Sequence, residues 1–134
     1  MAIPFTFRFY GQEVTHLKAS TNGVITFDTL ATTLSQGNYA LSSDSLADQS
    51  IACFWDEFTA SAPTGSGDDI RYNVFGTAPN RQLWIKWYSF ELGDPSMSFV
   101  YMAAVLEEGT DNIYIVDQYS TTSNITSMDA TAGL

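Results

Sequence analysis

The sequence has few of the residues that cross-link a chain or ligate a metal. It contains one cysteine, Cys53, and one histidine, His16. A single cysteine rules out a framework of disulfides within the chain, and one cysteine with one histidine argues against a zinc site. Cys53 lies in an apolar run, so we expect a buried small hydrophobic side chain rather than a catalytic thiol. His16 is expected on the surface of a strand, and no motif of a serine triad accompanies it.

Positive charge is also scarce: five Lys and Arg stand against fifteen Asp and Glu, which gives a net charge of −10. Without a basic patch, nucleic acids are disfavoured as partners, and so are anionic membrane surfaces. No apolar run reaches the roughly 18 residues of a membrane span, so we expect no membrane insertion. The acidity mainly predicts solubility.

The length of 134 residues predicts one domain, spanning 1–134. No signal peptide is recognisable, and Met1-Ala2 runs directly into a predicted strand. We therefore expect a domain excised from a larger protein.

The residues that are abundant are apolar and aromatic, and their spacing predicts strands. In Ile3–Tyr10, Phe5, Phe7 and Phe9 alternate with more polar residues, which is the period of a half-buried strand. Asn22-Gly23 suits a tight hairpin turn. Further strands are predicted at Val14–Ala19, Val24–Asp28, Ile51–Trp55, Ile70–Phe75, Gln82–Leu92, Ser98–Glu107 and Ile113–Tyr119.

No segment has a helical period, and turn residues separate the short strands regularly. This pattern predicts an all-β fold, an antiparallel, jelly-roll-like β-sandwich of about eight to ten strands. The Ser- and Thr-rich stretch Thr29–Gln49 is predicted to be one long loop with a short helical turn near Ser45–Ala47. The last residues, Ala132-Gly133-Leu134, are expected to lie in a strand, and an open sheet edge there could pair with another chain.

Two acidic pairs are the candidate metal ligands. Asp56 and Glu57 end an apolar strand, and Asp68 and Asp69 follow a Gly-Ser-Gly loop. If the two loops meet, four carboxylates could bind a calcium ion through oxygen atoms; the spacing matches no EF-hand. The alternative is that these carboxylates accept hydrogen bonds from backbone N–H groups.

A hydrolase using Asp56, Glu57 or Asp68 would need two carboxylates at a defined separation, and the sequence shows no such geometry. We therefore expect no enzyme.

Two aromatic residues are the candidate ligand-binding residues. Trp84 and Tyr88 lie on the face of their strand opposite Leu83, Ile85 and Trp87. If that face is exposed, they could stack on sugar rings; if it is covered, they pack, which we favour. A carbohydrate-binding module should present coplanar exposed rings beside polar groups, whereas an assembly module should show an open edge strand and buried Trp84 and Tyr88.

Six short motifs, taken in order, resemble a known family. They are Pro-Phe-Thr-Phe-Arg-Phe-Tyr-Gly (4–11), Ser-Thr-Asn-Gly-Val-Ile-Thr-Phe (20–27), Ile-Ala-Cys-Phe-Trp-Asp-Glu-Phe (51–58), Arg-Gln-Leu-Trp-Ile-Lys-Trp (81–87), Val-Leu-Glu-Glu-Gly (105–109) and Ala-Thr-Ala-Gly-Leu (130–134). Together they resemble the nidogen-like β-sandwich of extracellular matrix proteins, and most closely its relatives in secreted bacterial multidomain proteins.

The resemblance implies an extracellular or cell-surface module that is not an enzyme and that mediates adhesion or protein assembly. Its implied partners are other extracellular proteins or copies of itself, with glycans as an alternative. The family supplies no catalytic residues. One position departs from the expected pattern: Glu57 stands where a second aspartate would follow the Trp-Asp pair. The longer side chain would alter the geometry of any shared cation site.

Overall fold

The computed structural model describes residues 1–32, 38–41, 43–59, 69–92, 99–121 and 130–134. The regular elements in these ranges are strands, which confirms the all-β prediction. They are β1 (Ala2–Phe9), β2 (Gln12–His16), β3 (Lys18–Ala19), β4 (Val24–Thr26), β5 (Ser50–Trp55), β6 (Phe58–Thr59), β7 (Asp69–Thr77), β8 (Asn80–Leu92), β9 (Phe99–Glu107), β10 (Ile113–Thr121) and β11 (Thr131–Gly133).

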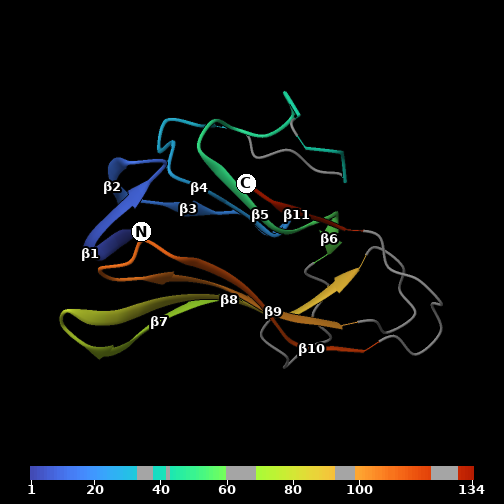
Figure 1. The fold of residues 1–134 in the computed structure, drawn as a ribbon. Helices are drawn as coiled ribbons and strands as arrows, with labels where there is room; N and C mark the ends of the chain where they lie inside the picture. Colours follow the sequence, from blue (N-terminus) through green and yellow to red (C-terminus); the bar gives the residue numbers. More distant parts are fainter. Residues whose placement is uncertain (33–37, 42, 60–68, 93–98, 122–129) are drawn as a thin grey trace.

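The strands form two layers and a hairpin (Figure 1). One layer is a four-stranded sheet in the order β11-β5-β4-β3. The other has the order β10-β9-β8, with β7 and β6 both pairing along the remaining side of the long strand β8. All pairs are antiparallel, and β1 pairs with β2 as a separate hairpin. The predicted antiparallel sandwich is therefore confirmed.

The core lies between the layers, and β1 contributes to it as its sequence predicts. The buried residues of β1 alternate strictly with exposed ones, and Phe5, Phe7 and Phe9 all belong to the main core cluster. The rings of Phe7 and Phe9 lie 6.1 and 4.8 Å from that of Phe27, which follows β4. Since burying one such side chain contributes roughly 1.5–3 kcal/mol, this hairpin is a major part of the core.

Trp87 joins the two layers by a hydrogen bond as well as by packing. It lies on β8 with Leu83 and Ile85 on the predicted inner face, and it is fully buried. Its indole N–H donates to the carbonyl oxygen of Ser20, in the turn between β3 and β4, at 2.7 Å. The polar end of the largest core side chain on this strand is thereby satisfied, as buried indoles require.

Strand β5 has apolar residues on both faces because both faces are covered. Towards β8 and β9, Ile51 and Cys53 join the main core. On the other face, Trp55 and Ala52 form a second cluster with Val24, and Leu46 of the long loop packs against it. The ring of Tyr39, also in this loop, lies 5.6 Å from that of Trp55. The described part of the predicted loop thus covers the outer face of the four-stranded sheet.

Most predicted strands differ from the observed ones by one or two residues at an end, and two of the differences have a structural cause. The predicted strand Val14–Ala19 is divided at Leu17, because β2 pairs with β1 whereas β3 pairs with β4 in another sheet. The side chain of Leu17 is buried at this change of sheet. The predicted strand Val24–Asp28 ends at Thr26, whose hydroxyl oxygen accepts a hydrogen bond from the amide of Asp28 at 3.0 Å.

The predicted helical turn near Ser45–Ala47 is a non-helical turn, closed by a bond from the Leu46 amide to the Ser43 carbonyl oxygen at 3.0 Å.

Two of the described strands, β3 and β6, have only two residues each. The other nine described strands are longer, and nine agrees with the predicted eight to ten strands.

Two glutamates at the turn between β9 and β10 are held by several donors. Glu107 accepts hydrogen bonds from Thr110, Gln82, Asn112 and Tyr114. These bonds, the one from Thr110 above all, lower the pKa of Glu107. Glu108 is bound by the guanidinium of Arg81 at 2.8 and 2.7 Å, which lowers the pKa of Glu108. Both carboxylates therefore favour the folded state in their ionised form.

We expect Glu108→Gln to reduce the pH dependence of stability between pH 6 and pH 3, a range chosen around the ordinary glutamate pKa of 4.5. Because the folded pKa lies below the unfolded one, the contribution of Glu108 is present above about pH 4.5 and disappears as the pH falls through the folded pKa. Thermal melting at a series of pH values measures this effect. Glu13→Gln, at an exposed position on β2, is the control. Equal pH slopes for Glu108→Gln and the wild type would contradict the assignment.

Candidate functional site

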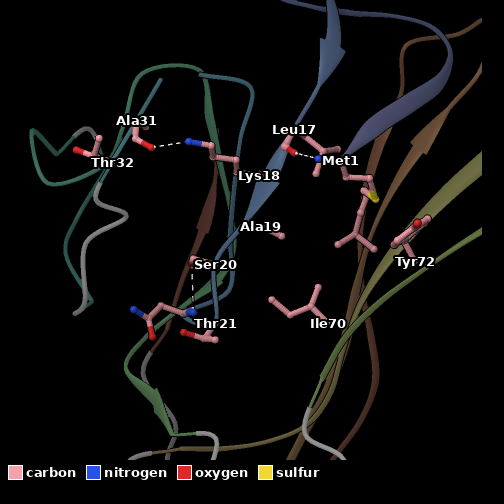
Figure 2. A pocket seen from close by; sticks show the side chains of 12 residues that line it. Met1, Leu17, Lys18, Ala19, Ser20, Thr21, Ala31, Thr32, Ile70 and Tyr72 are labelled. Carbon is pink, nitrogen blue, oxygen red and sulfur yellow. Dashed lines mark hydrogen bonds between the residues drawn. The ribbon is translucent and has the colours of Figure 1, made fainter. Parts of the chain in front are cut away.

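A cleft opens along one side of the sandwich, where β3 and β7 face each other across the gap between the layers (Figure 2). Its volume is about 650 Å³. We call it the β3–β7 cleft and define it by its lining residues: Met1, Leu17, Lys18, Ala19, Ser20, Thr21, Asn22, Ala31, Thr32, Ile70, Tyr72 and Ile85.

The cleft exists because the two sheets differ in extent. Ile70, Tyr72 and Val74 of β7 are the register partners of Trp87, Ile85 and Leu83, so they face the same inner side of the sheet. The opposing strand β3 has only two residues and does not cover them. Tyr72 consequently remains 62% exposed and Val74 44% exposed, although both lie on the face that forms the core elsewhere.

The lining of the cleft is mixed, with apolar and polar side chains. Leu17 and Ile85, both nearly inaccessible, line it together with the half-buried Ile70. The ammonium group of Lys18 donates to the Ala31 carbonyl oxygen at 2.8 Å, as Figure 2 shows. The amide of Asn22 donates to the Ser20 hydroxyl oxygen at 3.2 Å. Apolar surface combined with a few polar groups is typical of binding clefts.

The backbone edge of β7 that borders this cleft is unpaired in the described part of the chain. β7 pairs with β8 along one side, and no other strand in the described ranges pairs with it. An edge strand presents unpaired N–H and C=O groups, which natural proteins usually protect with proline, lysine or bulges. The nine residues of β7 contain neither proline nor lysine, so this edge lacks two of the common protections.

Trp84 and Tyr88 lie on the outer face of the large sheet, as predicted. Trp84 is half-buried and Tyr88 is 42% exposed, so neither is enclosed as a core residue would be. The burial of both side chains that is expected of an assembly module is therefore not observed in this chain. The ring of Tyr88 meets that of Tyr101 at 90°, and the ring of Trp84 meets that of Phe75 at 84°. These contacts are edge-to-face, so neither pair is the coplanar platform expected of a sugar-stacking site.

The predicted calcium ligands are only partly described. Asp56 accepts a hydrogen bond from the amide of Glu57 at 2.7 Å, in line with the backbone-binding alternative. Asp69 lies on β7 and binds the guanidinium of Arg71 at 2.6 Å. Asp68 lies outside the described residues. Within the described residues, no three of the His, Cys, Asp and Glu side chains gather in a group that could hold a metal ion. The four-carboxylate calcium site stays a prediction.

Cys53 and His16 have the surroundings expected from the sequence. Cys53 is fully buried on β5, and this burial raises the pKa of its thiol to about 12. Since the thiolate is the reactive form, the side chain acts as a small hydrophobic core residue. His16 is exposed at the end of β2.

Sequence reasoning missed the β3–β7 cleft and the open edge beside it. The strand itself was predicted at Ile70–Phe75, but its place at the edge of the sheet depends on how distant strands pair. The sequence instead indicated an edge near Leu134, where β11 does end the four-stranded sheet beside β5. The composition of β7 gave no signal, because the central strand β9 also lacks proline and lysine.

Comparison with known proteins places the chain in a family. No curated protein and no solved structure matches it. None of the described residues forms a helix long and apolar enough to cross a membrane. The model of the family described as "NIDO related" matches residues 1–134, the full length given. Its match agrees with the resemblance drawn from the six motifs, several of whose residues form the core. The chain belongs to the NIDO-related family.

Proposed function

We propose that this chain is a non-catalytic extracellular module that serves adhesion or protein assembly by binding an extended segment of another protein along β7. NIDO-related domains are generally extracellular, which supports the location. The observation that carries the proposal is the edge of β7, unpaired within the described residues, beside the partly apolar β3–β7 cleft. In this arrangement one incoming strand gains backbone partners and apolar contacts together.

The register of β7 specifies the chemistry of the segment that fits. A strand added to a sheet edge binds through main-chain hydrogen bonds, and pockets for alternate side chains give specificity. Every second side chain of the segment would lie beside Ile70, Tyr72 and Val74, on the side of the cleft, and should be apolar. The intervening side chains would lie beside Arg71, Asn73 and Phe75 and can be polar. The net charge of −10 favours a neutral or basic segment over an acidic one.

A displayed library of random 12-residue peptides, selected on the purified protein, tests the proposal. We expect enriched peptides with apolar residues at alternating positions. Tyr72→Lys should weaken their binding at least about tenfold, a loss of roughly 1.4 kcal/mol, because it places a charge on the face that receives the apolar side chains. Tyr72 is largely exposed in the free protein, so we expect the substitution to leave the fold intact.

The matched control is Ile115→Lys on β10, the strand at the opposite edge of the same sheet. Ile115 is 42% exposed and faces the inner side as the partner of Ala104. Peptide binding to Ile115→Lys should equal that to the wild type. Failure to enrich peptides with alternating apolar residues, or peptides that bind Tyr72→Lys as well as the wild type, would contradict the proposal. Thermal melting establishes that both variants fold.

The two alternative functions, a carbohydrate-binding module and a hydrolase, differ in the observations that support them. Carbohydrate binding is favoured by a hollow on the outer face of the large sheet that is lined by cations, amides and phenols. No observation on the described residues favours the hydrolase alternative.

A further inference from the structure

A second, shallower hollow lies on the outer face of the large sheet, away from the core. Its volume is about 460 Å³, within the range of ligand pockets. It spans β7, β8, β9 and β10, and its lining residues are Arg71, Asn73, Lys86, Tyr88, Tyr101 and Gln118. We call it the outer-face hollow. It is distinct from the β3–β7 cleft, which lies on the inner side of the same sheet.

The outer-face hollow concentrates positive charge in a strongly acidic chain. Two of the five Lys and Arg residues line it, and these two, Arg71 and Lys86, are direct register partners on β7 and β8. Like charges directly opposite each other destabilise a strand pair. Asp69 binds Arg71 at 2.6 Å, but none of the ion pairs among the described residues includes Lys86. Within the described residues, Lys86 therefore has no carboxylate partner.

Aromatic rings hold both cations in place. The guanidinium carbon of Arg71 lies 4.4 Å from the centre of the Tyr88 ring. The ammonium nitrogen of Lys86 lies 5.5 Å from the centres of both the Phe75 and the Trp84 rings. Such cation–π contacts fix a flexible side chain without neutralising its charge. The rings therefore position the cations over the sheet, where an anion could meet them.

We propose that the outer-face hollow binds the anionic group, a carboxylate or a sulfate, of an acidic polysaccharide. Lys86 supplies the opposite charge, and Arg71, already bound to Asp69, is its register partner. The side-chain amides of Asn73 and Gln118, which line the same hollow, can donate to and accept from sugar hydroxyls. This mixture of neutral amides and phenols around two cations favours a sugar over an acidic peptide. Recognition rests on charge and on hydrogen bonds to sugar hydroxyls. It does not rest on stacking, because the ring pairs at this site meet edge-to-face and form no coplanar platform.

Binding to four immobilised polymers tests this proposal: polygalacturonate, dextran sulfate, neutral dextran and polyglutamate. We expect the wild-type protein to bind polygalacturonate, dextran sulfate or both, and the polymer that it prefers identifies the anionic group. Binding should weaken as salt rises from about 50 mM to about 500 mM, because salt screens exposed charges. Binding to neutral dextran and to polyglutamate should be much weaker.

The decisive variant is Lys86→Gln, with Arg8→Gln as its matched control. Both remove one positive charge, but Arg8 lies on β1 and is paired with Asp111. We expect Lys86→Gln to weaken polysaccharide binding about tenfold, as loss of a charge-assisted hydrogen bond would, and Arg8→Gln to leave it unchanged. Arg71→Gln should weaken binding as well. Thermal melting checks that each variant folds.

Four outcomes would overturn the proposal. The first is that the protein binds neither anionic polysaccharide. The second is equal binding to neutral dextran, which would remove the role of charge. The third is equal or tighter binding to polyglutamate, which would point to an acidic peptide instead. The fourth is an equal loss in Arg8→Gln and Lys86→Gln, which would mean that overall charge, rather than this hollow, governs binding.

Discussion

Replacing Trp87 by alanine is expected to destabilise the fold by about 3–5 kcal/mol, the usual cost of removing a buried tryptophan. Trp87 has no accessible surface and packs in the main core on the inner face of β8. Its indole N–H also donates to the carbonyl oxygen of Ser20 at 2.7 Å, so the same side chain fastens the large sheet to the turn between β3 and β4. Small domains have a total stability of about 5–15 kcal/mol, and this one substitution would remove a large part of it.

Two further variants test the place of Trp87 in the core. Trp87→Phe keeps an aromatic ring but removes the donor to Ser20 and part of the buried ring volume, and should cost about 1–3 kcal/mol, less than Trp87→Ala. Trp84→Ala, on the half-buried outer face of the same strand, should cost less than Trp87→Ala. Denaturant unfolding measures all three. A loss for Trp84→Ala that equals or exceeds the loss for Trp87→Ala would contradict the assignment of inner and outer faces.

Gly23→Ala is expected to be the second severe substitution, with a loss of about 3 kcal/mol or more. The backbone of Gly23 has φ +74°, a left-handed conformation that costs other residues about 1–2 kcal/mol. An added Cβ would also clash with the backbone carbonyl oxygen of Phe54. The carbonyl oxygen of Gly23 accepts the amides of Cys53 and Phe54 at 2.9 and 3.3 Å. The turn therefore cannot move away without breaking its contact with β5.

Gly11→Ala is the matched control for this prediction. Gly11 has almost the same conformation, with φ +78°, but nothing lies within 4 Å of the position of an added Cβ. Its substitution should cost only the conformational strain, about 1–2 kcal/mol. The difference between the two variants in the free energy of unfolding isolates the close approach of Gly23 to β5. Equal losses would show that the contact with Phe54 carries no weight.

The sequence predicted those parts of the fold that depend on local periodicity. The alternation of Phe5, Phe7 and Phe9 gave the buried face of β1, and the alternation along 82–88 separated Trp87 from Trp84 correctly. The uninterrupted apolar run at Ile51–Trp55 indicated a strand buried on both faces, and β5 does lie between β4 and β11. In each case the pattern of apolar residues along the sequence predicts which single side chains are buried.

Features that depend on distant pairing could not be predicted in the same way. Leu17 belongs to a run that reads as one strand, yet the chain changes sheets there because β2 and β3 have different partners. Tyr72 and Val74 read as ordinary strand residues, and only the short β3 opposite them leaves them exposed. The pairing of Arg71 with Lys86 likewise depends on the register of β7 against β8. Both proposed sites arise from such non-local arrangements.

Backbone hydrogen exchange along β7, measured with and without a selected peptide, tests most directly whether this edge binds the partner. The open edge of β7 should exchange readily in the free protein, since its outward amides have no strand partner in the described structure. The account predicts that a bound segment slows exchange within 69–77 and leaves 113–121, the opposite edge, unchanged. Slowed exchange elsewhere, with 69–77 unaffected by a bound peptide, would contradict it.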